Sequence, residues 1–269
     1  MYLEYYKLKE LPFLPSPDSR FLYLSDQVSE TLQKCIYIIS NRIGPLYCAG
    51  PIGTGKTTLA KRLYQQLEAE EGKYLLAYLV IPPKMTLNSF LRLLMDEFGI
   101  KRERSYEAGL KSLAAWLVEQ VQAGVKPLVI MDEAQNLSKD HLQLLHFVLN
   151  YETYREKLLQ MVLFGQNELA QSIERFPEIK SRMYPAALAA LNRKDMEDMI
   201  RFRWQVAGGR EFPFTDMALD ELYQVSLGLP REIVKTCDLS LLHAFSNKRY
   251  QVEMVDIVEA ADQLGLRRA

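Results

Sequence analysis

The run Gly50-Pro-Ile-Gly-Thr-Gly-Lys-Thr-Thr58 constrains the fold of this chain more than any other feature. It has the spacing Gly-x4-Gly-Lys-Thr and lies between a short apolar run, residues 46–49, and a segment with helical periodicity. Glycines let backbone N–H groups face phosphate oxygens without a Cβ clash, and the N-terminus of the following helix adds partial positive charge. The run therefore predicts a phosphate-binding loop of the Walker A type inside a strand–loop–helix unit.

This loop also predicts the ligands. We expect Lys56 to contact the β- and γ-phosphates of a nucleotide and the hydroxyl of Thr57 to bind Mg²⁺. The predicted cofactors are therefore ATP and Mg²⁺. The expected nucleotide-binding residues are Gly50, Pro51, Gly53, Thr54, Gly55, Lys56, Thr57 and Thr58.

Two adjacent carboxylates follow the apolar run at residues 128–131. We expect Asp132 to orient Mg²⁺ at the end of a buried strand. Glu133 comes next, so strand alternation directs its side chain elsewhere, where it can polarise a water molecule as general base. The pair favours ATP hydrolysis over phosphoryl transfer to a small acceptor, although a regulatory ATP sensor and a simple acidic helix N-terminus stay open.

Three further segments carry candidate functional side chains. Gln166 follows an apolar run and can orient the attacking water; Asn167 is the second choice, and the alternative is a helix cap, for which Asn167 is well suited. Arg175 and Arg182 lie before the next predicted strand and can reach a neighbouring subunit's nucleotide, or they are solvated surface arginines. Arg231 is expected in the first turn of a later helix, where it is either functional or a surface side chain.

Apolar runs of strand length alternate with helical segments as far as residue 191, which indicates a parallel sheet with helices on both faces. After that point only helices are expected, in four segments: 193–207, 216–227, 230–247 and 252–264. The predicted organisation is an irregular N-terminal arm (1–25), an α/β nucleotide-binding domain (26–191) and an all-α lid domain (192–269).

Composition narrows the class of protein. The 33 Lys+Arg balance 34 Asp+Glu, which excludes a bulk polycation but permits a local basic surface. The three cysteines show no pairing framework. The N-terminus lacks a signal-peptide pattern, and we find no apolar stretch of the ~18 residues that a membrane span needs. We therefore expect a cytoplasmic protein without a membrane span.

Several motifs together resemble one family. The Walker A run, Val129-Ile-Met-Asp-Glu-Ala-Gln135, Leu163-Phe-Gly-Gln-Asn-Glu-Leu169, Lys180-Ser-Arg-Met183 and Gly228-Leu-Pro-Arg231 occur in the order seen in AAA+ ATPases. The chain resembles the AAA+ subgroup shared by ExeA/GspA-type secretion ATPases and TnsC/TniB/MuB-type transposition regulators. The resemblance implies a P-loop NTPase fold, Arg182 as arginine finger and Arg231 as the sensor 2 residue. Asn167 stands where the family usually has proline, so sensor 1 is either Gln166 or Asn167.

The two branches imply different partners. A chain that ends directly after the last predicted helix looks more like a stand-alone TnsC-type regulator. That branch implies sequence-nonspecific binding to duplex DNA, a homo-oligomer built as a ring, hexamer or helical filament, and two partners, a transposase and a TniQ/TnsD-like target-selection protein. The alternative is an ExeA-type ATPase of secretion or envelope assembly.

Basic residues outside the motifs are the candidates for DNA contacts. Lys101, Arg102 and Arg104 cluster in a predicted loop, and Lys139 begins a predicted helix. They can track phosphates in an oligomer, or they form an ordinary solvated loop. The run Arg201-Phe-Arg-Trp204 interleaves cations with aromatic rings, but its helical periodicity favours partial burial of the rings.

Overall fold

The computed structural model describes residues 2–151 and 157–266. The chain divides into two compact units. The first contains Met1–Val28, Gly53–Thr58 and Ala189–Ala269, and the second contains Ser29–Ile52 and Leu59–Leu188. The phosphate loop thus begins in the second unit and ends in the first.

The second unit is built on a parallel five-stranded sheet of order β2-β3-β4-β1-β5. Its strands are β1 (Leu46–Ala49), β2 (Tyr74–Val80), β3 (Lys126–Asp132), β4 (Gln160–Gly165) and β5 (Tyr184–Ala187). The two strands β3 and β4 are buried almost throughout. Burial on both faces explains why they read as unbroken apolar runs, and the predicted α/β parallel sheet is confirmed.

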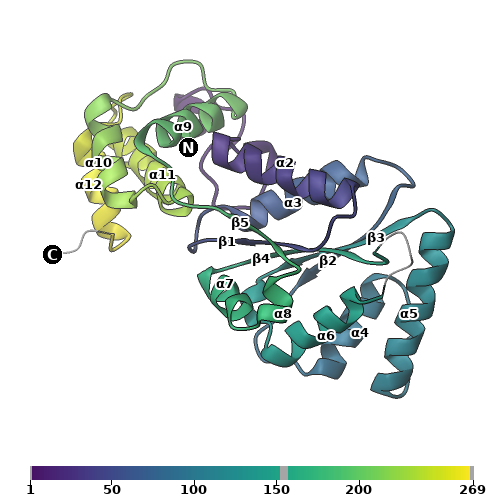
Figure 1. Ribbon diagram of the computed structural model, residues 1–269. Helices are drawn as coiled ribbons and strands as arrows, with labels where there is room; N and C mark the ends of the chain where they lie inside the picture. Colours follow the sequence, from purple (N-terminus) through teal and green to yellow (C-terminus); the bar gives the residue numbers. More distant parts are fainter. Residues whose placement is uncertain (1, 152–156, 267–269) are drawn as a thin grey trace. The chain divides into compact units, whose positions relative to one another are not determined.

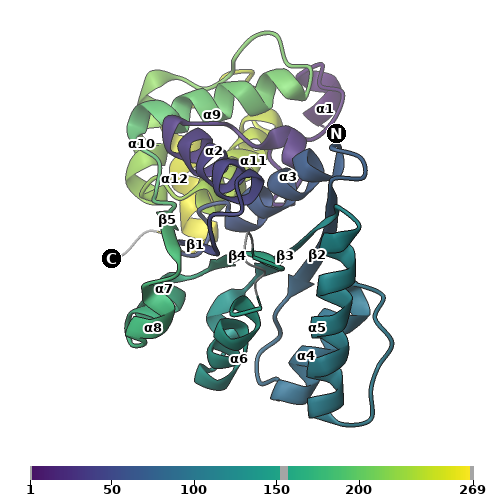
Figure 2. The same ribbon diagram turned by 45° about the vertical axis from the view of Figure 1, so that its right-hand side comes forward.

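Helices cover both faces of this sheet (Figures 1 and 2). One face carries α2 (Asp26–Ser40) and α3 (Lys56–Glu68). The other carries α4 (Leu87–Glu97), α5 (Tyr106–Gln122), α6 (Lys139–Leu149), α7 (Asn167–Glu174) and α8 (Pro177–Lys180). Thr86, Ser105 and Ser138 cap α4, α5 and α6 through their hydroxyl oxygens, which explains where these helices begin.

The first unit contains the C-terminal helices, and all four lie within two residues of the predicted bounds. They are α9 (Arg193–Val206), α10 (Asp216–Ser226), α11 (Pro230–Ser246) and α12 (Met254–Gln263). Asn192 and Thr215 accept capping bonds at α9 and α10, and Pro230 occupies the first turn of α11. Their apolar faces form one core around Trp204, Leu222 and Leu241.

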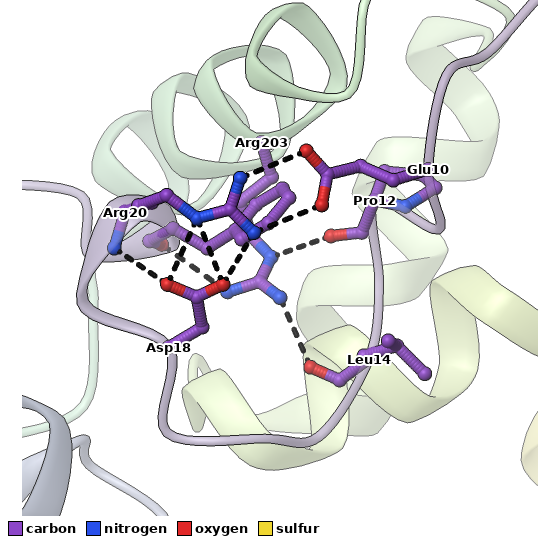
Figure 3. Close-up of polar contacts among 7 residues, drawn as sticks. Glu10, Pro12, Leu14, Asp18, Arg20 and Arg203 are labelled. Carbon is purple, nitrogen blue, oxygen red and sulfur yellow. Dashed lines mark hydrogen bonds and ion pairs between the residues drawn. The ribbon is translucent and has the colours of Figure 1, made fainter.

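The N-terminal arm packs into this same core. Its described residues form two short elements, α1 (Tyr2–Tyr5) and the 3-10 turn η1 (Ser19–Phe21), and its Tyr2, Tyr6 and Phe13 are buried. Figure 3 shows the guanidinium of Arg203 from α9 reaching among the backbone carbonyls of the arm. It donates to the carbonyl oxygens of Pro12 at 2.9 Å, Leu14 at 3.0 Å and Phe21 at 3.2 Å.

Arg203 is therefore an interior residue of the first unit. Its residue surface is 8% exposed, and burial lowers the pKa of its guanidinium to about 10. Of the basic and aromatic run at 201–204, Trp204 is buried too, as the helical periodicity predicted. The guanidinium of Arg203 is therefore engaged inside the protein.

Candidate active site

Three of the predicted site segments follow neighbouring strands of the sheet at the same edge. Gly50 follows β1, Asp132 ends β3, and Gln166 follows β4, which lies between the other two. Because the strands are parallel, their carboxyl ends meet at one edge, where α/β proteins bind ligands. The edge is tied together by the backbone N–H of Gly50, which donates to the carbonyl of Gly165 at 3.3 Å.

The phosphate loop has the backbone that its glycines predict. Gly53 and Gly55 have φ angles of +86° and +93°, in the left-handed region that favours glycine. The helix α3 begins at Lys56, so the backbone N–H groups of its first turn follow directly on the loop. Thr54 is buried. This geometry is that of an anion-binding loop.

Arg231 lies against the end of this loop, within the first unit. It is the second residue of α11, and its backbone N–H donates to the carbonyl of Gly53 at 3.1 Å. A Cβ on Gly53 would lie 2.9 Å from the Cβ of Arg231, so a larger residue would force the two segments apart. The structure thus brings the predicted sensor 2 arginine to the phosphate loop, although its role stays a prediction.

Asp132 is held rigidly at the end of β3. It is only 3% exposed, and its carboxylate accepts bonds from the hydroxyl of Tyr78 at 3.3 Å and from the backbone N–H of Glu133 at 2.9 Å. Burial is the largest cause that raises the pKa of Tyr78, and the negative charge of Asp132 is the second. The tyrosine therefore stays protonated and can donate a hydrogen bond. Sequence reasoning missed Tyr78, whose only signal is a hydroxyl within an apolar strand, β2.

Glu133 has an unusual backbone for a glutamate. Its φ of +55° places it in the left-handed region, between β3 and the 3-10 turn η2 (Ala134–Asn136). Non-glycine residues with such backbones cluster at functional sites. The Glu133 carboxylate accepts a hydrogen bond from the side-chain amide nitrogen of Gln135. The side-chain carbonyl of Gln135 accepts one from the backbone N–H of Gln166 at 3.0 Å. The sequence shows Gln135 within the motif at residues 129–135 but predicts no role for it.

The end of β4 settles one alternative. Gln166, and not Asn167, is the residue that precedes the first turn of α7, and its side chain makes no capping bond. The suggestion that Asn167 caps a helix is therefore wrong, because Asn167 is already the first helical residue and is exposed. Both residues stay candidates for sensor 1.

Arg182 lies at the opposite end of the strands, where they begin. It precedes β5, whose first residue, Tyr184, pairs with Leu46 at the start of β1. The phosphate loop follows the other end of β1. The Arg182 side chain is exposed and its guanidinium donates to the side-chain carbonyl of Asn150. Arg175 is also exposed, at the end of α7. Within one subunit, Arg182 and the acidic pair therefore lie on different edges.

The predicted DNA contacts fall on two different elements. Lys101, Arg102 and Arg104 are exposed in the loop between α4 and α5, and Arg102 binds Asp96 through two bonds, 2.7 Å and 2.5 Å long. Lys139 is the exposed first residue of α6 and lies 5.5 Å from the ring centre of Phe176.

Comparison with known proteins agrees with this geometry. Residues 41–173 match the family model described as an AAA domain. The chain carries an AAA-type ATPase domain. Over 278 aligned positions it is 35% identical to general secretion pathway protein A of Aeromonas hydrophila, which covers 99% of this chain. The chain spans 49% of the length of that relative.

Solved structures agree on the fold. Cdc6p from Pyrobaculum aerophilum is similar with a TM-score of 0.70 and 17% identity, over 91% of this chain and 70% of that one. Drosophila ORC bound to DNA is similar with a TM-score of 0.69 and 15% identity, over 98% of this chain and 66% of that one. These matches agree on the AAA+ fold, and the AAA domain at residues 41–173 indicates an ATPase.

Each helix within residues 2–151 and 157–266 is too short or too polar to cross a bilayer.

Proposed function

We propose that this protein hydrolyses ATP at the carboxyl edge of its sheet and completes the site with an arginine from a neighbouring copy. Lys56 binds the β- and γ-phosphates, Glu133 takes the proton of the attacking water, and Gln166 or Asn167 orients that water. Arg231 contacts the nucleotide from the helical region. Arg182 of the next subunit neutralises charge that develops on the transferred phosphoryl group.

The residues also fit a magnesium ion. The hydroxyl of Thr57 and the carboxylate of Asp132 are the hard oxygen donors that Mg²⁺ prefers, and Asp132 is fixed by two hydrogen bonds. These two residues would hold the ion, which would supply positive charge beside the phosphates. Tyr78 and the Glu133 N–H keep the Asp132 carboxylate in one orientation.

The observation that carries the proposal is the separation of Arg182 from the acidic pair within one subunit. Arg182 lies at the amino edge of β5, whereas the acidic pair lies near the carboxyl edge of β3. An arginine finger in that place serves another subunit's nucleotide, so hydrolysis requires a homo-oligomer. Rings, hexamers and helical filaments all satisfy this requirement.

A mixing experiment tests the arrangement. Arg182→Ala retains a complete phosphate loop, and Glu133→Gln still binds ATP and retains the finger but lacks the general base. Each variant alone should be inactive, and the mixture should regain ATPase activity if Arg182 acts between subunits. Sedimentation confirms that the mixture assembles. An assembled but inactive mixture would contradict the proposal for Arg182, and repeating it with Arg175→Ala tests the other arginine.

We further propose that the ATPase acts in the cytoplasm and drives a step of secretion or envelope assembly. This is the ExeA-type alternative that the sequence left open. The support is the 35% identity along 99% of this chain to general secretion pathway protein A. Loss of secreted proteins from a strain that carries Glu133→Gln would support it. Normal secretion by that strain would count against it.

A second candidate is ATP-dependent binding to duplex DNA in a TnsC-type regulator, with a transposase and a TniQ/TnsD-like protein as partners. It is favoured by the exposed basic loop at 101–104 and by a fold shared with Drosophila ORC bound to DNA. Replacing Lys101 and Arg104 by glutamate should weaken DNA binding and reduce its salt dependence. Lys111→Glu, on the exposed surface of α5, is the control.

A further inference from the structure

The carboxamide of Gln135 uses both of its ends. Its Nε2 donates to Oε2 of Glu133, and its Oε1 accepts from the backbone N–H of Gln166 at 3.0 Å. One side chain therefore joins the residue after β3 to the residue after β4. An amide suits this place because it carries a donor and an acceptor in one rigid plane.

The end of β4 is packed closely against the same segment. A Cβ on Gly165 would lie 3.0 Å from the backbone nitrogen of Gln135 and 2.8 Å from Cδ2 of Leu169, so glycine allows this approach. The carbonyl of Gly165 in turn accepts the bond from Gly50. A continuous set of contacts thus leads from the first residue of the phosphate loop to the carboxylate of Glu133.

A flexible side chain at Glu133 needs such a partner. Glutamate loses considerable rotamer freedom when it is fixed, and a misplacement of about 1 Å at a reacting group can cost ~10²-fold in rate. The Gln135 bond engages Oε2, and the carboxylate keeps further lone pairs through which water can be deprotonated. The neighbouring Asn136 makes a different contact, because its amide donates to the carbonyl of Ile81 at 2.7 Å.

We propose that Gln135 is a positioning residue for ATP hydrolysis: it holds the carboxylate of Glu133 in register with the end of β4 and, through Gly165, with the phosphate loop. This inference rests on the proposed role of Glu133 as general base. Gln135 acts through Glu133 and contacts no nucleotide in this role, so it should affect turnover and leave nucleotide binding alone.

Steady-state ATPase kinetics test the proposal. Gln135→Leu, which keeps the size of the side chain but removes both bonds, should lower kcat about 10- to 100-fold and leave KM unchanged. Asn136→Ala is the matched control, since it removes a side-chain hydrogen bond in the same turn without changing the contacts of Glu133. Its kcat should stay near that of the wild type. Equal losses in the two variants would indicate a general role in loop stability and overturn the proposal.

A second variant separates the two bonds of Gln135. Gln135→Glu can still accept from Gln166, but it places a like charge beside Glu133. It should lose at least as much turnover as Gln135→Leu, and it keeps the test usable if the leucine variant does not fold. Wild-type turnover in Gln135→Glu would overturn the proposal, because the bond to Glu133 would then be dispensable.

A double-variant cycle distinguishes this inference from the role of Glu133. In a Glu133→Gln background, adding Gln135→Leu should cause no further loss, because the group it positions is already gone. If Glu133→Gln alone keeps wild-type turnover, the proposed base is wrong. If Glu133→Gln loses turnover but Gln135→Leu does not, the base stands and the inference about Gln135 is overturned.

Discussion

Asp132 and Arg203 are both charged and both buried, but they serve different purposes. Asp132 is fixed by a tyrosine and a backbone N–H at the edge of a sheet, where a phosphate loop also begins. Arg203 is surrounded by three backbone carbonyls of the N-terminal arm, deep in the helical unit. The first arrangement fixes a carboxylate that we propose to bind Mg²⁺, whereas the second uses a charge to hold the chain itself.

The comparison implies that changes at the two places should separate cleanly. Substitutions at the sheet edge should reduce ATPase activity with little effect on thermal stability. Substitutions around Arg203 should reduce stability with little effect on the turnover of the protein that stays folded. Four predictions test this division, from the largest expected effect to the smallest.

Lys56→Ala should abolish nucleotide binding and, with it, ATP-dependent assembly. Lys56 is the expected cation at the β- and γ-phosphates, and no backbone group can replace its charge. Binding of a fluorescent ATP analogue measures the loss, and the apo protein should melt at the wild-type temperature. Undiminished affinity would show that the loop does not bind phosphate as proposed.

Glu133→Gln should bind ATP normally and hydrolyse it about 10²- to 10⁴-fold more slowly. The amide keeps the shape of the side chain but cannot accept a proton. Single-turnover hydrolysis with parallel binding measurements separates the two steps. If turnover were unchanged, the left-handed backbone at Glu133 would need an explanation other than catalysis.

Arg203→Met should destabilise the helical unit by about 2–4 kcal/mol, because three carbonyls lose a buried donor. Chemical denaturation measures the change. The control is Arg201→Met on the same helix: Arg201 is partly exposed, pairs with Glu197 and lies over Phe212, so its loss should cost less than ~1 kcal/mol. Equal effects would remove the contrast between buried and exposed arginines.

Tyr78→Phe should raise the Mg²⁺ concentration needed for half-maximal ATPase activity only modestly, by about tenfold. It removes one hydrogen-bond donor to the Asp132 carboxylate, at 3.3 Å. Titrating ATPase activity with Mg²⁺ measures the shift. Tyr64→Phe is the control, since Tyr64 packs edge-on against the ring of Tyr78. A shift in the control as large as that in Tyr78→Phe would attribute the effect to packing.

The sequence predicted the sheet edge well because its requirements are local. The phosphate loop needs glycines and a lysine within nine residues, and the acidic pair directly ends an apolar run. The four C-terminal helices were predictable for the same reason, since caps and periodicity lie within each segment. The predicted helix cap at Asn167 was wrong by one residue, since Gln166 precedes the first turn of α7. The local sequence does not decide which of the two residues takes the capping position.

The contacts that sequence reasoning missed join distant segments. Tyr78 reaches Asp132 across 54 positions, Gln135 reaches Gln166 across 31, and Arg203 reaches the arm across 182 to 191. Each of these side chains is compatible with an ordinary strand, turn or helix surface. Their partners are set by how the segments pack, which no local pattern encodes.

The long separation between Arg203 and the arm also orders the events of synthesis. Residues 12–21 leave the ribosome well before the arginine that satisfies their carbonyls, by roughly 10–40 s at ordinary elongation rates. Until then the arm has neither this donor nor the aromatic core that buries Tyr6 and Phe13. The sheet of the second unit, complete by residue 187, can form during that interval. Residues 12–21 are therefore made well before Arg203 and are among the last segments to fold.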